Sequence, residues 1–297
     1  MQLLSEQIDQ FLVGLAWSLW TELGVAGIER HHQNCLISLE ELILLTAYIA
    51  KKDPRLRDEA LDWCSRNHYF VSISRLKTLA KSLGKTVEEP FSLFAATLNA
   101  TGQTKWPTFI SAAPLKFISS GKSTPPRCEL PALLSLRVRA LFGVSARADL
   151  ITYFLTQASP QFTASGLTLL GYSKRNLAEI LDSLVQSGLF DAFMTRNQKC
   201  YQFLKRDQML QLIGPLPKVI LPWRDILELI LLLRNCILQV EQKSEKIRIV
   251  EVRNTLMKIE NTLRKLKLTP PPVQADFNAY WTAFSKWLLI TLRNLCE

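Results

Sequence analysis

The chain has 297 residues, 48% of them hydrophobic, with modest glycine and proline content and no low-complexity tract. This composition excludes a disordered or fibrous protein, and the length is sufficient for two or three domains with cores of their own. The formal net charge of +10 is compatible with a polyanionic partner such as nucleic acid, and also with a role in solubility alone.

The six cysteines include no Cys-x-x-Cys pair, so the sequence indicates neither a zinc ribbon nor a disulfide framework, and we expect a cytoplasmic protein. Glu6 and Asp9 stand where a secretory signal peptide would carry basic residues. The most apolar stretch, residues 226–240, holds Glu228 and Arg234 and is shorter than the roughly 20 apolar residues that a membrane span needs. We therefore expect no association with a membrane.

Residues 1–100 show helical spacing throughout and are expected to form a multi-helix domain with a net charge of −2. In this domain the stretch "DPRLRDEALDWC" predicts the start of a helix, with Asp53 as its N-cap and Pro54 at its first position. Trp17 and Trp20 also lie at helical spacing, which is typical of a core. Because aromatic side chains also anchor interfaces, a ligand or protein partner at this domain stays an open alternative.

No set of residues predicts an enzyme, and the alternative of a nucleic-acid-processing enzyme would require the acidic residues of the N-terminal half to converge in one carboxylate cluster. His31, His32 and Cys35 are the nearest approach to a metal site, with His31 and Cys35 expected on one helical face, but further ligands are missing nearby. The acidic residues of the segment 53–62 are explained by helix capping and by surface ion pairs with neighbouring arginines. No phosphate-binding loop spacing occurs. We expect no catalytic residues, no metal and no cofactor.

Residues 101–143 are expected to be a basic, proline-containing connecting segment with a net charge of +5. Its aromatic residues, among them Trp106, Phe109 and Phe117, suggest that it packs against the protein.

Residues 144–213 read as three helices followed by a β-hairpin. The first helix is expected around Leu150 and Phe154, and a second, short helix over residues 163–170. In the third helix the apolar side chains recur at i, i+3, i+4, i+7 and i+8, namely Leu177, Ile180, Leu181, Leu184 and Val185. Gly171 and Gly188 bound this third helix. The segments "LFDAFMT" and "CYQFL" flank "RNQK", which predicts a hairpin with its turn near Asn197.

This order of elements resembles the winged helix-turn-helix module of bacterial transcriptional regulators, with Gly166 in the second helix as a departure. The resemblance implies double-stranded DNA as partner, with the third helix in the major groove and the hairpin on the backbone. It implies base-reading roles for Lys174, Arg175 and Asn176, which follow the capping residue Ser173, and phosphate contacts for Arg196 and Lys199.

Two observations keep an alternative open. Glu179 and Asp182 lie on the solvent-facing side of the third helix, where they would repel phosphates, and residues 144–213 carry a net charge of only +2. A protein-interaction or scaffold protein, in which the winged helix docks a protein partner, would instead carry an apolar groove on the outer face of that helix.

Residues 214–297 contain two apolar seams that are out of phase, from Ile226 to Val240 and from Ile249 to Leu266, so the polar "EQKSEK" between them predicts a turn. A last helix is expected to place Phe277, Trp281, Phe284 and Leu288 on one side. These features predict a C-terminal helical hairpin or bundle available for homodimerisation. The basic residues between 248 and 267 could track phosphates or form a solvated helix face.

The sequence thus predicts a mainly α-helical protein with a multi-helix N-terminal domain, a central winged helix-turn-helix and a C-terminal helical region. The function expected is that of a DNA-binding transcriptional regulator, such as one controlling a toxin-antitoxin or defence locus.

Overall fold

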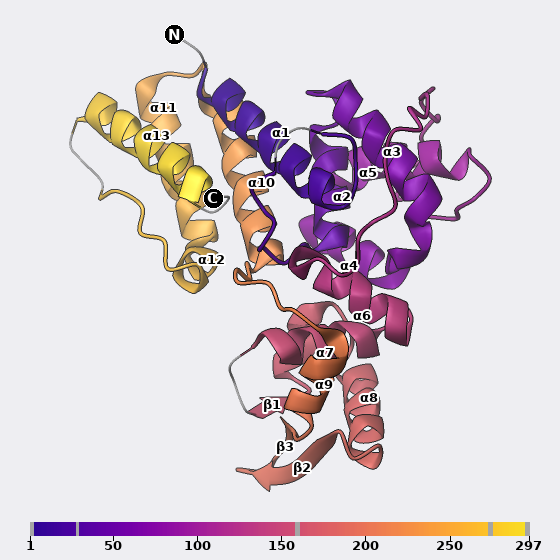
Figure 1. Ribbon diagram of the computed structural model, residues 1–297. Helices are drawn as coiled ribbons and strands as arrows, with labels where there is room; N and C mark the ends of the chain where they lie inside the picture. The colour runs from indigo at the N-terminus through magenta and orange to yellow at the C-terminus, as the bar shows by residue number, and fades with distance from the viewer. Residues whose placement is uncertain (1–2, 28–29, 158–160, 273–275, 295–297) are drawn as a thin grey trace.

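The structure, a computed structural model, describes residues 3–27, 30–157, 161–272 and 276–294 (Figure 1). It is mainly helical and contains a small three-stranded antiparallel sheet. The α-helices are α1 (Leu4–Glu22), α2 (Leu39–Ile49), α3 (Pro54–Asn67), α4 (Ile73–Leu83), α5 (Lys85–Asn99), α6 (Leu134–Phe142), α7 (Ala146–Thr156), α8 (Lys174–Gln186), α9 (Arg206–Ile213), α10 (Trp223–Val240), α11 (Glu245–Lys258), α12 (Glu260–Lys265) and α13 (Phe277–Asn294). Three short 3-10 helices, η1 (His68–Phe70), η2 (Pro131–Leu133) and η3 (Gly166–Leu170), complete them. Within the described ranges, no helix combines the length and apolarity needed to cross a bilayer.

The first five α-helices and the last four share one hydrophobic core. Together they form the upper part of the molecule as drawn in Figure 1. Helix α10 packs between α1 and α2 on one side and α11 on the other, and its Ile226 and Ile237 are fully buried. Polar contacts join the same helices, because Arg234 of α10 donates to Asp9 of α1 and to Tyr48 of α2. Residues 1–100 and 214–297, expected as separate regions, therefore contribute helices to one core.

The C-terminal helices follow the expected breaks but use their apolar faces differently. Helix α10 ends at Val240 and α11 begins at Glu245, on either side of the predicted turn. Apart from Leu266, which is partly buried, the side chains of both seams are buried within the chain instead of facing outward. The stripe expected on α13 was partly wrong, since Phe277 is 41% exposed and the core-facing positions begin at Tyr280. Spacing by fours from Tyr280 through Phe284 places those side chains against α1 and α11.

The segment expected to connect the domains is irregular only up to residue 130. Trp106 is buried, and its backbone N–H donates to the Asn99 side chain, so this stretch packs on α5 as its aromatic residues suggested. Beyond it the chain forms η2 and α6, which the prediction of a connecting segment through residue 143 missed. Helix α6 packs against α7 and α9 and so belongs structurally with the helices that follow it.

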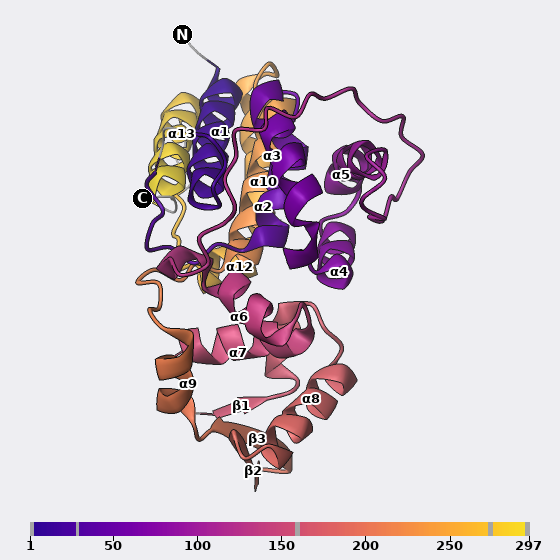
Figure 2. The same ribbon diagram turned by 45° about the vertical axis from the view of Figure 1, so that its right-hand side comes forward.

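The lower part consists of α6 to α9 and the sheet (Figures 1 and 2). Strands β1 (Gln161–Thr163), β2 (Phe190–Thr195) and β3 (Gln198–Phe203) are ordered β1-β3-β2, all antiparallel. Phe154, Leu181, Phe190 and Tyr201 form its core between sheet and helices.

The expected second helix over residues 163–170 was wrong at its beginning. Thr163 is the last residue of β1, and its Oγ1 accepts a hydrogen bond of 3.1 Å from the N–H of Gly166. A short 3-10 helix then runs to Leu170. Gly166 therefore occupies the start of a tight turn, where its poor helix propensity costs little.

Candidate nucleic-acid interface

The first turn of α8 projects into solvent from a well-defined start. Gly171 adopts φ +89°, a left-handed conformation that glycine reaches without strain, and Ser173 then caps the helix by accepting from the Asn176 N–H at 3.2 Å. Lys174, Arg175 and Asn176 are all exposed. The structure therefore brings together the four residues expected at the entrance of this helix.

The opposite face of α8 holds the helix in place. Leu177, Leu181 and Leu184 are buried in the core of the lower part, together with Phe154 and Phe190. An amphipathic helix packed in this way is fixed by its apolar stripe, so its polar face has a defined direction.

Arg175 is engaged only at the surface. Its Nε lies 2.9 Å from Glu179 Oε1, one helical turn away, and the two side chains are 90% and 61% exposed. Exposed ion pairs of this kind contribute little to stability, so Arg175 can exchange Glu179 for another acceptor at small cost. Glu179 nevertheless remains beside any anion that Arg175 would bind.

Lys199 does not lie at the tip of the hairpin as expected. Its Nζ lies 2.6 Å from Asp182 Oδ1 on α8, and Tyr201 donates to the same oxygen at 2.8 Å. The hydrogen bond from Lys199 holds the pKa of Asp182 below its ordinary value. Lys199 thus neutralises an acidic residue of α8, and the repulsion that Asp182 would exert on phosphates is reduced.

The hairpin tip is a two-residue turn made by Arg196 and Asn197, in the place the sequence predicted. Both residues have positive φ, 47° and 60°, as a tight turn of this twist requires. Thr195 and Gln198 are paired on either side. Arg196 is exposed, and among the described residues it has no ion-pair partner.

The outer face of α8 is polar. The exposed large apolar side chains of the described residues include none from α8. The nearest ones on the hairpin and before the helix are Met194, 67% exposed, and Leu169, 49% exposed. The apolar groove expected of a protein-docking helix is therefore not found on this face.

One basic residue beside α8 escaped the sequence reasoning. Arg147, in the first turn of α7, is exposed and donates to Ser183 Oγ at 3.1 Å, so it lies along the flank of α8. Its sequence signal was weak, because a single arginine at the start of a helix is common on any protein surface. Of the basic residues between 248 and 267, Arg264 pairs with Glu260 and Lys265 pairs with Asp225 of α10.

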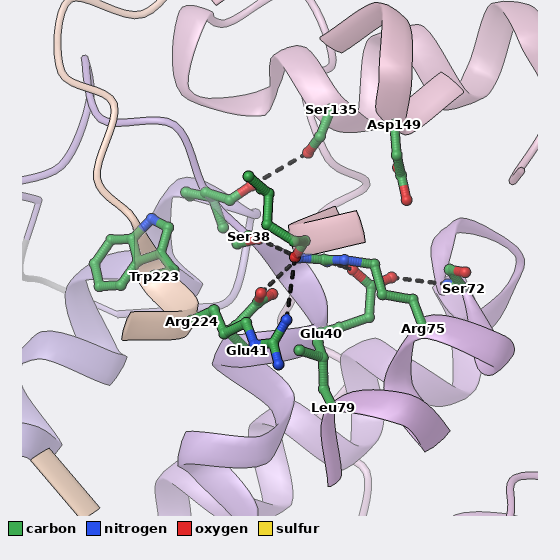
Figure 3. Close-up of polar contacts among 12 residues, drawn as sticks. Ser38, Glu40, Glu41, Ser72, Arg75, Leu79, Ser135, Asp149, Trp223 and Arg224 are labelled. Carbon is green, nitrogen blue, oxygen red and sulfur yellow. Dashed lines mark hydrogen bonds and ion pairs between the residues drawn. The ribbon is translucent and has the colours of Figure 1, made fainter. Parts of the chain in front are cut away.

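A buried ion network fixes the lower part against the upper part (Figure 3). Arg139 of α6 is 3% exposed and donates to both carboxylate oxygens of Glu40 on α2, at 2.7 and 3.1 Å, and to Asp149 of α7 at 2.9 Å. Asp149 in turn accepts from the Tyr172 hydroxyl at 2.7 Å, one residue before the α8 cap. Arg75 of α4 also donates to Glu40. This network connects the entrance of α8 to α2 and α4.

Glu40 is ionised within this network. Its complete burial alone would raise its pKa, but the guanidinium groups of Arg139 and Arg75 and the Ser72 N–H, which donates at 2.8 Å, lower the pKa to about 2. A buried carboxylate with these partners is a fixed structural charge.

Two other features, the segment with His31 and Cys35 and a cavity in the N-terminal region, do not form a recognisable binding site. His31 and Cys35 lie in an irregular segment and share no helix, which corrects that expectation, and across the described ranges no group of histidine, cysteine and acidic residues could hold a metal. A cavity of about 450 Å³ lies among α2, α3, α5 and residues 110–115. Its lining includes Lys51, Arg57 and Glu89, charges of both signs that select no particular ligand.

The chain matches none of the known protein families, curated proteins or solved structures with which it was compared.

Proposed function

We propose that residues 144–213 form a winged helix-turn-helix module that binds double-stranded DNA and that the chain is a transcriptional regulator. The observation that carries this proposal is the first turn of α8, where Lys174, Arg175 and Asn176 are exposed together on a face without exposed large apolar side chains. Arginine can pair bidentately with guanine and asparagine with adenine, and an N-terminal turn is the part of such a helix that reaches base edges.

The hairpin supports the same assignment. The tip residue Arg196 is exposed and lies in the turn between β2 and β3, outside α8, so it could reach a phosphate outside the groove that α8 enters. Lys199 has a different proposed role from the one expected: it offsets the charge of Asp182 beside the bound DNA.

We further propose a homodimer formed through the C-terminal helices, by a surface other than the two seams. Ile247, Val250 and Met257 are 46%, 47% and 73% exposed and lie on the outer face of α11. We call these three residues the α11 stripe. A symmetric contact between two copies would cover this stripe, and a dimeric regulator would present two α8 helices to two half-sites.

Protein docking is the rival function, and salt dependence separates the two. The test is retention of a random-sequence duplex pool by the purified protein at low and moderate salt, followed by sequencing of the retained duplexes. The proposal expects an enriched palindrome and a steep loss of affinity with salt. No retention of DNA at low salt would overturn it.

A further inference from the structure

Helix α4 carries a charge unlike that of the rest of the N-terminal region. Residues 1–100 have a net charge of −2, but the stretch from Ser72 to Val87 holds four basic residues and no acidic one. Three of the four, Lys77, Lys81 and Lys85, are exposed.

The other exposed polar positions of α4 are hydroxyls. Ser74, Thr78 and Ser82 alternate with Lys77 and Lys81 on the solvent face, while Leu76, Leu79 and Ala80 face the core. The Thr78 and Ser82 hydroxyls donate to backbone carbonyls of α4, so the lysines are the free donors to phosphate oxygens on this face. No carboxylate of α4 would repel a polyanion.

The start of α4 lies against the entrance of α8. Ser72 Oγ and the Tyr172 hydroxyl are 3.4 Å apart, and Tyr172 directly precedes the capping residue of α8. A Cβ added at Gly171 would lie 3.7 Å from Arg75 Cγ. In both Figure 1 and Figure 2, α4 lies close to α6 and above α8.

Buried charges hold this arrangement. Arg75, the fourth basic residue, donates to Glu40, Glu41 and Ser38, and Glu40 is also bound by Arg139 of α6. The Arg75 guanidinium is occupied by these partners and holds α4 in position. Lys77 and Lys81, in contrast, have no ion-pair partner among the residues described.

We propose that the exposed face of α4 binds the phosphates of the DNA that flanks the segment contacted by α8. This inference rests on the proposed DNA-binding function and extends its surface into the N-terminal region. The contact would be independent of base sequence, because lysine contacts to phosphates carry no sequence information.

The test is DNA affinity over a series of salt concentrations for the Lys77→Gln/Lys81→Gln double variant, with a selected duplex and a random-sequence duplex. Each phosphate contact adds about 0.9 to the salt slope, so loss of two should lower the slope by about 2 on both duplexes. The Lys116→Gln/Lys122→Gln variant is the control, since it removes the same charge from the irregular segment before η2, and its slope should stay unchanged.

The outcomes separate this inference from the proposed function. If the wild type binds DNA and Arg175→Ala weakens that binding, but the α4 variant keeps the full slope, the α4 contact is refuted and the function stands. An equal loss of slope in the control would also refute it, because net charge alone would then explain the effect. Failure of the wild type to bind any duplex would refute both the α4 contact and the proposed DNA-binding function.

Discussion

Arg175 is the side chain on which sequence discrimination should depend most. It is 90% exposed and held only by an exposed ion pair with Glu179. Arg175→Ala should cost about 1–3 kcal/mol of discrimination, because a bidentate contact to a base edge is worth that amount. Competition titrations with the selected duplex and with single-base variants of it would measure this loss.

Glu179→Gln is the matched control for that variant. It frees Arg175 and removes a negative charge from the surface, so binding to all duplexes should tighten. A loss in Arg175→Ala that is equal on selected and random duplexes would show that Arg175 contacts only phosphate.

Arg196 combines backbone strain with a proposed phosphate contact, and two substitutions can separate them. Its φ of 47° costs a non-glycine residue about 1–2 kcal/mol, so Arg196→Gly should raise the free energy of unfolding by about that amount while weakening binding to every duplex. Arg196→Ala should weaken binding equally without that gain in stability. Chemical denaturation and DNA titration of both variants measure the two effects. Unchanged DNA binding in both would mean that the hairpin tip does not touch DNA.

Contacts between residues close in the chain could be predicted from the sequence, whereas contacts between residues far apart in the chain could not. Ser173 as a cap follows from its place before an apolar periodic segment, and the bond from Asn176 confirms it. The pairing of Lys199 with Asp182 joins residues 17 positions apart on different elements, and no one-dimensional pattern reports such a contact.

At the scale of elements, the network around Glu40 should make stability depend on pH. The pKa of Glu40 is lowered from 4.5 to about 2 in the folded chain, so its contribution is present above the unfolded value and is lost as the pH falls towards 2. The free energy of unfolding should therefore fall between about pH 5 and pH 2. In Glu40→Gln this part of the pH dependence should be absent.

Denaturant titrations at several pH values compare the two proteins, with Glu245→Gln as control because Glu245 is exposed in the first turn of α11 and has no ion-pair partner among the described residues. Parallel pH profiles of wild type and Glu40→Gln would contradict an ionised Glu40.

Elements with long, regular spacing were predicted, whereas short ones were missed. Helix α8 follows its leucine spacing closely. Strand β1 has only three residues and becomes recognisable only through its pairing with β3. Helix α6 was hidden because the prolines before it suggested an irregular segment throughout. The α13 stripe was misplaced because Phe277 and Tyr280 suit an apolar face equally, and tertiary packing selects between them.

At the scale of the whole molecule, the sequence could not show that the N-terminal and C-terminal helices share a core. The ion pair between Asp9 and Arg234 joins residues 225 positions apart, and the seams of α10 and α11 have the same apolar periodicity whether they face another copy or their own chain. In the structure their own chain covers them, so only the outer surface of these helices is left for a second copy.

The α11 stripe consists of three exposed apolar side chains on one helix face, which a dimer would cover. Val250→Glu/Met257→Glu should make the protein monomeric, since it places carboxylates where a symmetric contact would bury apolar side chains. Sedimentation velocity of wild type and variant measures the change. Ile118→Glu, at a side chain 86% exposed in the irregular segment, is the control and should leave the mass unchanged.

The same variant connects assembly to DNA binding. A monomer presents a single α8, so it should bind one half-site and lose the preference for a palindrome, while contacts of Arg175 within that half-site persist. If the variant sediments as the wild type does, or if the wild type is itself a monomer, the α11 stripe is not a dimer interface.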